Sequence, residues 1–165
     1  MSDIIALFQA HYQREPQAVA AAPGRLEILG NHTDYNEGFT LSAAVSQITE
    51  FAIAAVPGRK CRLKDFRDDS IVEFDLDHID KPTPKDWSNY VKGVIVELRK
   101  RGIEIGAFDG GILSTVPLSA GMSSSAALEV SAAFAFSAVF GIELSKTEWA
   151  KVGQGVENHY MGLKS

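Results

Sequence analysis

A short stretch rich in small residues and serines, residues 116–127 (VPLSAGMSSSAA), separates an expected strand from an expected helix. Small residues let the backbone approach a ligand closely. Serines at a helix start add hydroxyl groups beside unpaired backbone N–H groups, and the helix dipole favours an anion there, so the stretch suits a triphosphate. It is neither a Walker A loop nor a G-x-G-x-x-G motif. The residues alone equally allow a structural interpretation, an N-capped helix with a small-residue face for tight packing.

A polar segment earlier in the chain, residues 23–36 (PGRLEILGNHTDYN), is dense in side chains that can bind a ligand. Asn31, His32 and Asp34 can hydrogen-bond several hydroxyl groups at once, and a carboxylate makes the stronger, charge-assisted bonds. That chemistry suits a sugar, while the fixed fork of Arg25 suits a phosphate. Two other interpretations stay open. His32 and Asp34 could be metal ligands, although no third imidazole or cysteine lies nearby, or the segment is a solvated turn.

Glu157 lies on the last expected helix, at the edge of its apolar face. A carboxylate in that position can reach a bound Mg²⁺ together with a hydroxyl group from elsewhere in the chain. Taken alone it is a weak signal, because most helical glutamates are solvated. Cys61, in an expected strand, is interpreted as a small buried hydrophobic residue rather than as a nucleophile.

Hydrophobic spacing and turn residues predict the elements that position these side chains. Helices are expected at residues 2–15, 87–101, 124–140 and 145–160, and strands at residues 17–22, 47–56, 61–66, 71–76 and 108–116. Pro23 and Gly24 are expected to stop the first strand, and residues 31–38 to form a polar loop. Strands that come first and helices that follow predict an α+β fold, a mixed β-sheet with helices packed on it.

Two of the expected helices show a clear apolar face. In the helix at residues 87–101 this face consists of Val91, Val94, Ile95 and Leu98. In the helix at residues 145–160 it consists of Trp149, Val152, Val156 and Tyr160. Ser145 and Glu148 have the spacing of a capping box at the start of that last helix.

Composition excludes several classes of protein. The chain has 165 residues and a formal net charge of −5, with 45% hydrophobic residues. This length suits one domain, which buries about 70% of its unfolded surface. The mild acidity argues against nucleic-acid binding, and no run reaches the ~18 apolar residues of a membrane span. One cysteine excludes an intramolecular disulfide framework. With no signal peptide at the N-terminus, we expect a cytoplasmic protein without membrane or nucleic-acid partners.

Three of these segments occur together, in this order and spacing, in one known family. Residues 22–38 (APGRLEILGNHTDYNEG) resemble the galactokinase signature, G-R-x-N-hydrophobic-I-G-[DE]-H-x-D-Y. Residues 116–127 resemble the phosphate-binding motif of the wider GHMP kinases, which include the galactokinase, homoserine, mevalonate and phosphomevalonate kinases. Residues 156–162 (VENHYMG) resemble the helix end that precedes the family's Gly-x-x-Asp-Gln. The resemblance covers essentially the whole chain and implies that residues 1–165 form a GHMP kinase N-terminal domain.

The resemblance implies a sugar kinase that uses ATP and Mg²⁺ and phosphorylates the anomeric hydroxyl group of galactose or a related monosaccharide. Arg25 matches the arginine that stabilises the transferring phosphoryl group. The matching sugar-binding positions are Asn31, His32, Thr33, Asp34 and Tyr35. The matching triphosphate positions are Ser119, Ala120, Gly121, Met122, Ser123, Ser124 and Ser125. The matching Mg²⁺ ligands are Ser125 and Glu157.

Three positions depart from the family pattern: Glu27 stands for the signature's Asn, Asn31 for its Asp or Glu, and Ser119 for a usual Gly. An amide at Asn31 removes a charge and adds a donor, which puts strict galactose specificity in question. The family's catalytic Asp falls beyond Ser165, and the C-terminal GHMP domain is absent, so residues 1–165 are expected to be an inactive fragment. The alternatives are a non-catalytic sugar- and ATP-binding regulator, or another GHMP kinase that acts on a small alcohol.

Overall fold

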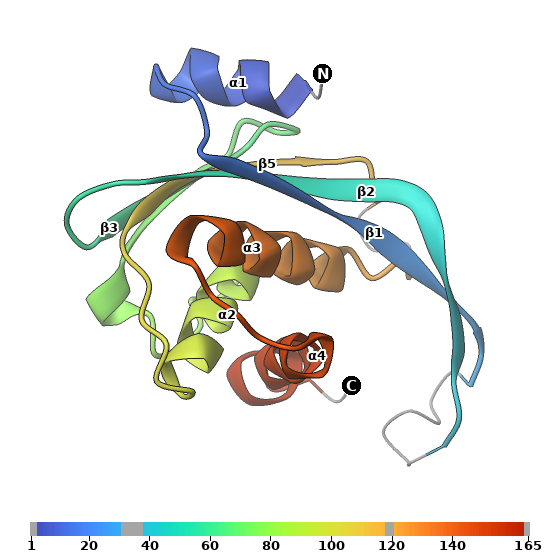
Figure 1. Ribbon diagram of the computed structural model, residues 1–165. Helices are drawn as coiled ribbons and strands as arrows, with labels where there is room; N and C mark the ends of the chain where they lie inside the picture. The colour runs from blue at the N-terminus through green and yellow to red at the C-terminus, as the bar shows by residue number, and fades with distance from the viewer. Residues whose placement is uncertain (1–2, 31–37, 118–120, 164–165) are drawn as a thin grey trace.

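A five-stranded mixed sheet organises the chain, with the strands in the order β1-β2-β5-β3-β4. The structure is a computed structural model that describes residues 3–30, 38–117 and 121–163 (Figure 1). The strands are β1 (Ala18–Leu29), β2 (Leu41–Ala55), β3 (Lys60–Asp65), β4 (Ile71–Asp75) and β5 (Phe108–Ser114). β3 and β5 are parallel, and every other pair of neighbours is antiparallel.

Helices cover both faces of the sheet. In Figure 1, α1 (Asp3–Tyr12) lies above the sheet, whereas α2 (Asn89–Arg99), α3 (Ser124–Phe140) and α4 (Lys146–Gly155) lie below it. A short 3₁₀ helix, η2 (Leu76–His78), follows β4, and a π-helical turn, η3 (Val156–Tyr160), continues α4. No helix in the described part of the chain is long and apolar enough to cross a membrane.

The alternation of side chains along β2 creates two cores. Phe51 and Ile53 face the three-helix layer and belong to the main core. Ala52 and Ala54 point to the other face and pack with Ile4 and Phe8 of α1 in a smaller core. Successive side chains of a strand point to opposite faces, so one strand supplies both cores. The centre of the sheet is therefore buried on both sides, and α1 is an integral part of the domain.

The α+β prediction, a mixed sheet with helices packed on it, is confirmed. The apolar face predicted for α2 is buried, and so is the face predicted for α4 and η3. Ser145 and Glu148 form the predicted capping box. α3 begins and ends at the predicted residues, and Gly141 ends it with a left-handed backbone, φ 65°. β3 and β4 lie within one residue of the strands predicted at 61–66 and 71–76 and pair as a hairpin, and Cys61 is fully buried, as expected for a small core residue.

The prediction of a short first strand that stops at Pro23 and Gly24 is wrong. β1 continues through both residues to Leu29, and β2 begins at Leu41 instead of residue 47. The antiparallel register between the two strands shifts between Pro23 and Arg25. Proline is tolerated at irregularities and on edge strands, and β1 is an edge strand. A second difference concerns the last helix, whose final turn, residues 156–160, is π-helical.

Beyond this shift, β1 and β2 form a two-stranded projection that we call the arm, residues 25–29 and 41–44. It bends down beside the helical layer, on the side of the sheet where α3 and α4 lie (Figure 1). Large apolar side chains are exposed there, namely Leu26, Ile28, Leu29 and Leu41. The arm carries Arg25 at its base.

Candidate functional site

The base of the arm meets the start of α3 backbone to backbone. The Arg25 N–H group donates a hydrogen bond of 2.9 Å to the Met122 carbonyl oxygen. A Cβ atom at Gly24 would lie 2.8 Å from the same oxygen, so only glycine permits this approach. The contact places Arg25 beside the serines of residues 123–125, although the two segments are far apart in sequence.

The backbone in front of α3 has two residues in the left-handed region. Gly121 has φ 70°, and Ser123, the residue before the helix, has φ 52°. A left-handed backbone is uncommon in residues other than glycine, and such conformations cluster at ligand-binding sites. Ser123 makes no side-chain capping hydrogen bond to the helix. The structural alternative is therefore borne out only for the small-residue face of α3, where Ala127, Ala132 and Ala135 are buried.

A hydroxyl group and a carboxylate from two different helices meet close to this helix start. The Ser125 hydroxyl group donates a hydrogen bond of 2.9 Å to Oε1 of Glu157. Glu157 lies on the π-helical turn η3, which is tied to the core by Tyr160, whose hydroxyl group donates to the Ile79 carbonyl oxygen at 2.8 Å. Hydroxyl and carboxylate oxygens are ligands that Mg²⁺ prefers.

Few other metal ligands surround this pair. No group of three or more His, Cys, Asp or Glu side chains able to hold a metal ion occurs among the residues the structure describes. Mg²⁺ usually binds through one or two carboxylates together with substrate phosphates and water. The pair of Ser125 and Glu157 therefore fits a cation that arrives with a phosphate better than a permanent metal site.

Glu129 is a component of the site that the sequence analysis missed. Its side chain is 2% exposed, and its Oε1 atom has no hydrogen-bond partner. Burial, and next the negative charge of Glu157, raise the pKa of Glu129 to about 9. One signal could have revealed it: Glu129 follows Ser125 by one helical turn and so lies on the same face of α3. In the sequence it reads only as an interruption of an apolar run.

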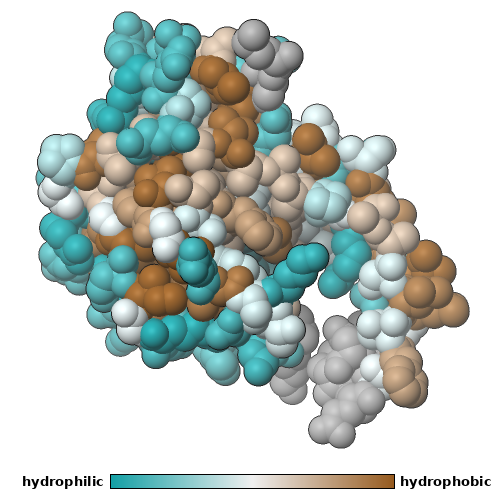
Figure 2. All heavy atoms as spheres, viewed as in Figure 1, coloured by the Kyte–Doolittle hydropathy of each residue, from teal (hydrophilic) through white to brown (hydrophobic). Residues whose placement is uncertain are grey.

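These groups line one hollow of about 600 Å³ between α3, α4 and the base of the arm. Its polar wall contains Arg25, Ser123, Ser125, Glu129 and Glu157, and its apolar wall contains Val130, Phe134 and Trp149. Figure 2 shows the body of the molecule and the arm on either side of an opening in the surface. A smaller hollow of about 70 Å³ borders Ser124 and Ser125 and is lined by Trp87, Tyr90 and Arg67. Two hollows of different size thus flank the start of α3, and both are lined by polar and aromatic side chains.

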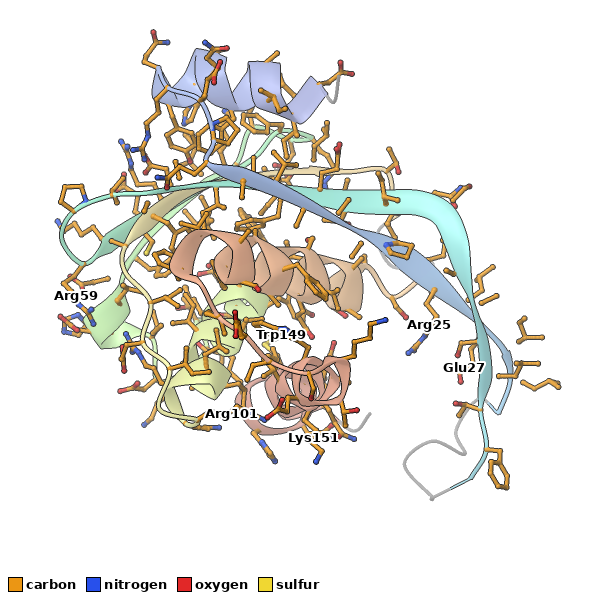
Figure 3. All side chains as sticks on the ribbon, viewed as in Figure 1. Arg25, Glu27, Arg59, Arg101, Trp149 and Lys151 are labelled. Carbon is orange, nitrogen blue, oxygen red and sulfur yellow. The ribbon has the colours of Figure 1, made fainter. Side chains whose placement is uncertain are left out.

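Arg25 and Glu27 lie on the same face of β1, and Figure 3 shows both side chains on the arm. The Arg25 guanidinium is 3.6 Å from the Glu27 carboxylate, measured from Nη2 to Oε2. The Arg25 side chain is 53% exposed and lines the hollow. A half-exposed guanidinium in this position can reach an anion in the hollow.

Several predicted site residues lie outside the described residues. They are Asn31, His32, Thr33, Asp34, Tyr35, Ser119 and Ala120. Of the predicted residues that are described, the structure brings together Arg25, Met122, Ser123, Ser125 and Glu157.

Comparison with known proteins identifies two family models in the chain. The galactokinase galactose-binding signature matches residues 6–59, and the GHMP kinases N terminal domain matches residues 89–165. The first match contains Arg25 and Glu27, and the second contains the serine segment and Glu157. The two matches therefore divide the candidate site between them.

Individual relatives are also galactokinases, and they match nearly the whole chain. The chain is 39% identical to a galactokinase of Chloroflexus aggregans over 99% of its own length, and 37% identical to one of Roseiflexus over 95%. It spans 42% and 40% of the length of these curated relatives.

Among solved structures, a Lactococcus lactis galactokinase complexed with galactose matches with a TM-score of 0.90 and 32% identity, covering 99% of this chain and 43% of that one. A mevalonate kinase of Methanococcus jannaschii matches with a TM-score of 0.77 and 25% identity, covering 90% of this chain and 48% of that one. The fold and the sequence agree, and the chain belongs to the GHMP kinase family, in which it matches the N-terminal part of the galactokinases.

Proposed function

We propose that the whole protein is a sugar kinase that transfers the γ-phosphoryl group of ATP to the anomeric hydroxyl group of galactose or a related monosaccharide. Residues 1–165 are its GHMP N-terminal domain in this proposal. The observation that carries it is the convergence of Arg25, the serine segment and the Ser125–Glu157 pair on one hollow. Phosphoryl transfer depends mainly on positioning and on charge stabilisation, and these groups supply both.

Each side chain has a defined task in this proposal. The N–H groups and hydroxyl groups at the start of α3 bind the triphosphate, and the Arg25 guanidinium stabilises charge on the transferring phosphoryl group. Ser125 and Glu157 hold Mg²⁺, which neutralises phosphate charge when bound. Oε1 of the buried Glu129 carboxyl has no hydrogen-bond partner among the described residues, and packing of the core gives no reason for a polar atom at this position in the hollow.

The sugar is assigned to the segment that follows β1, at positions Asn31, His32, Thr33, Asp34 and Tyr35. Its match to the galactokinase galactose-binding signature supports this assignment. Asn31 stands where the signature has an acid, so we expect the order of preference among sugars to differ from that of a strict galactokinase. Glu at this position, in an Asn31→Glu variant, is expected to shift preference towards galactose.

The catalytic base is proposed to be the Asp of the family's Gly-x-x-Asp-Gln, which falls after Ser165. Proton abstraction from the anomeric hydroxyl group then requires residues outside the present chain. We therefore expect residues 1–165 alone to produce no sugar phosphate.

The test uses the full-length protein with Mg-ATP and a panel of monosaccharides. We expect ADP release that depends on one sugar and a sugar 1-phosphate visible by phosphorus NMR. Arg25→Ala is expected to lower turnover by about 10²–10³-fold while sugar binding survives. Binding of sugar and ATP without a phosphorylated product would replace the kinase by the regulator. Phosphorylation of a small alcohol in place of every sugar would assign another GHMP activity.

A further inference from the structure

Glu27 is the charged side chain that accompanies Arg25 on β1. The two residues lie in a regular stretch of register, with Arg25 opposite Ala44 and Glu27 opposite Ser42. Register irregularities occur on either side of this stretch, between Pro23 and Arg25 and between Glu27 and Leu29. Residues two apart on a strand share a face, so the acid is fixed beside the arginine by the strand itself.

The ion pair of Arg25 with Glu27 is long, and its arginine is exposed. Its 3.6 Å separation exceeds the 2.5–2.9 Å seen in the tight pairs of this protein, for example Arg14 with Asp109. The Glu27 side chain is 23% exposed, against 53% for Arg25, so the carboxylate is the less exposed partner. Arg25 can therefore leave Glu27 with little loss of packing, since an exposed pair contributes little to stability.

Glu27 also differs in charge from the neutral Asn that the galactokinase signature has at this position. The hollow already contains the carboxyls of Glu129 and Glu157, and Lys146 and Arg25 are the basic residues that line it. A carboxylate at residue 27 adds negative charge next to Arg25. It occupies the guanidinium that a phosphate needs, whereas an amide could not do so with comparable strength.

We propose that Glu27 is a positioning residue that holds Arg25 when no phosphate is bound and competes with a polyphosphate for it. The inference rests on the proposed function in one respect, that the anion in the hollow is a polyphosphate. It predicts that this protein binds polyphosphate more weakly than the same scaffold with a neutral residue 27.

The test is a double-mutant cycle in the full-length protein, with magnesium tripolyphosphate as the probe and calorimetry as the readout. Glu27→Gln is expected to tighten binding by about two- to fivefold, the range of an exposed ion pair. In an Arg25→Ala background the same substitution is expected to give no gain, because the competition acts through Arg25. Glu73→Gln, the same chemical change on β4 at the opposite edge of the sheet, is the matched control and leaves the affinity unchanged.

Three results overturn the inference. The first is an equal gain in both backgrounds, which means that Glu27 acts only as a distant charge. The second is no gain at all, including the case in which no variant binds the probe. The third is a rise in the KM for sugar with the KM for Mg-ATP unchanged, which makes Glu27 a sugar ligand. In turnover, Glu27→Gln is expected to lower the KM for Mg-ATP. Glu27→Asp, which keeps the charge, is expected to have a KM for Mg-ATP closer to that of the wild type.

This experiment separates the inference from the proposed function. Tripolyphosphate binding requires no sugar and no turnover. If Glu27→Gln tightens binding through Arg25 but no sugar phosphate ever forms, the kinase proposal fails and the role of Glu27 stands. If sugar phosphate forms and the cycle shows no coupling, the kinase proposal stands and the role of Glu27 fails.

Discussion

The two faces of the sheet each bury an acidic side chain, and they treat it in opposite ways. Asp109, on the side of α1, is 1% exposed and is held by Arg14 and by both ends of the Arg62 guanidinium. Glu129, on the side of the three-helix layer, is 2% exposed and has a carboxyl oxygen without a partner. Its nearest charged neighbour is a second acid, Glu157, which acts to raise its pKa.

This difference between Asp109 and Glu129 distinguishes a carboxylate with a structural role from one with a functional role. A buried carboxylate with two arginines satisfies its charge and fixes the elements that carry these residues, here β5, β3 and the segment that follows α1. A buried carboxyl without a cation is costly and is retained where a site needs it. Substitutions that break the ion pairs of Asp109 should therefore lower stability, whereas substitutions on the Glu129 side should lower activity without lowering stability.

The largest expected effect is on turnover. Glu157→Gln in the full-length protein is expected to lower kcat by about 10²-fold or more, because an amide is a poor replacement for the carboxylate that we propose as a Mg²⁺ ligand. The thermal unfolding midpoint is expected to stay within about 2 °C of the wild type, since Glu157 is not part of a compensated ion pair. Equal losses in stability and in turnover would contradict the division between the two sides.

Asp109→Asn is the reciprocal test. It removes the charge from the hydrogen bonds to Arg14 and Arg62, and we expect the free energy of unfolding to fall by about 2–3 kcal/mol. The arginines are 36% and 50% exposed, which keeps the loss below that of a fully buried pair. Urea unfolding measures it. At temperatures where the variant is folded, turnover is expected to match the wild type, and a kcat defect would place Asp109 in the functional network.

Glu129→Gln is expected to stabilise the protein at neutral pH. The pKa of Glu129 is raised from 4.5 to about 9, so the folded state keeps a proton that the unfolded state releases above pH 4.5. The contribution of Glu129 to wild-type stability therefore falls as pH rises between these two values, by about 1.4 kcal/mol per pH unit. The amide has no such proton, so the gain should vanish near pH 4.5 and grow towards pH 9. A constant difference at all pH values would show that Glu129 does not titrate with folding.

Tyr12→Phe gives the smallest expected effect and refines the description of the Asp109 side. The Tyr12 hydroxyl group donates to the Gly110 carbonyl oxygen at 2.9 Å, and the Arg62 guanidinium lies 5.4 Å from the centre of its ring. The ring remains in the variant and one hydrogen bond is lost, so we expect a loss of about 1 kcal/mol. A change in sugar or nucleotide KM would mean that α1 communicates with the hollow.

Local periodicity predicted the helices and their buried faces because those signals lie within a few residues of one another. The faces of α2 and of α4 are examples, and the capping box located the start of α4 within one residue. The length of β1 could not be predicted in this way. Pro23 and Gly24 are turn residues locally, and what carries the strand past them is its pairing with β2, a non-local contact.

The residues of the candidate site also differ in whether local sequence signals could predict them. Arg25, the serine segment and Glu157 were recognisable because each belongs to a motif, and the structure brings them together. Glu129 was not, because its meaning depends on Glu157 arriving from another helix. The ion pair of Arg25 with Glu27 was equally invisible, since two residues two apart face each other only if the strand continues through Gly24.

Because β1 continues through Gly24, the site depends on the number of residues in this part of the strand. A strand alternates its side chains with a period of two, so the loss of one residue at this point moves every following side chain to the opposite face. Deletion of the Gly24 codon would leave Arg25 and Glu27 in the sequence and the arm paired, yet turn both side chains away from the hollow. The number of residues in β1, as well as their types, therefore decides whether Arg25 and Glu27 face the hollow.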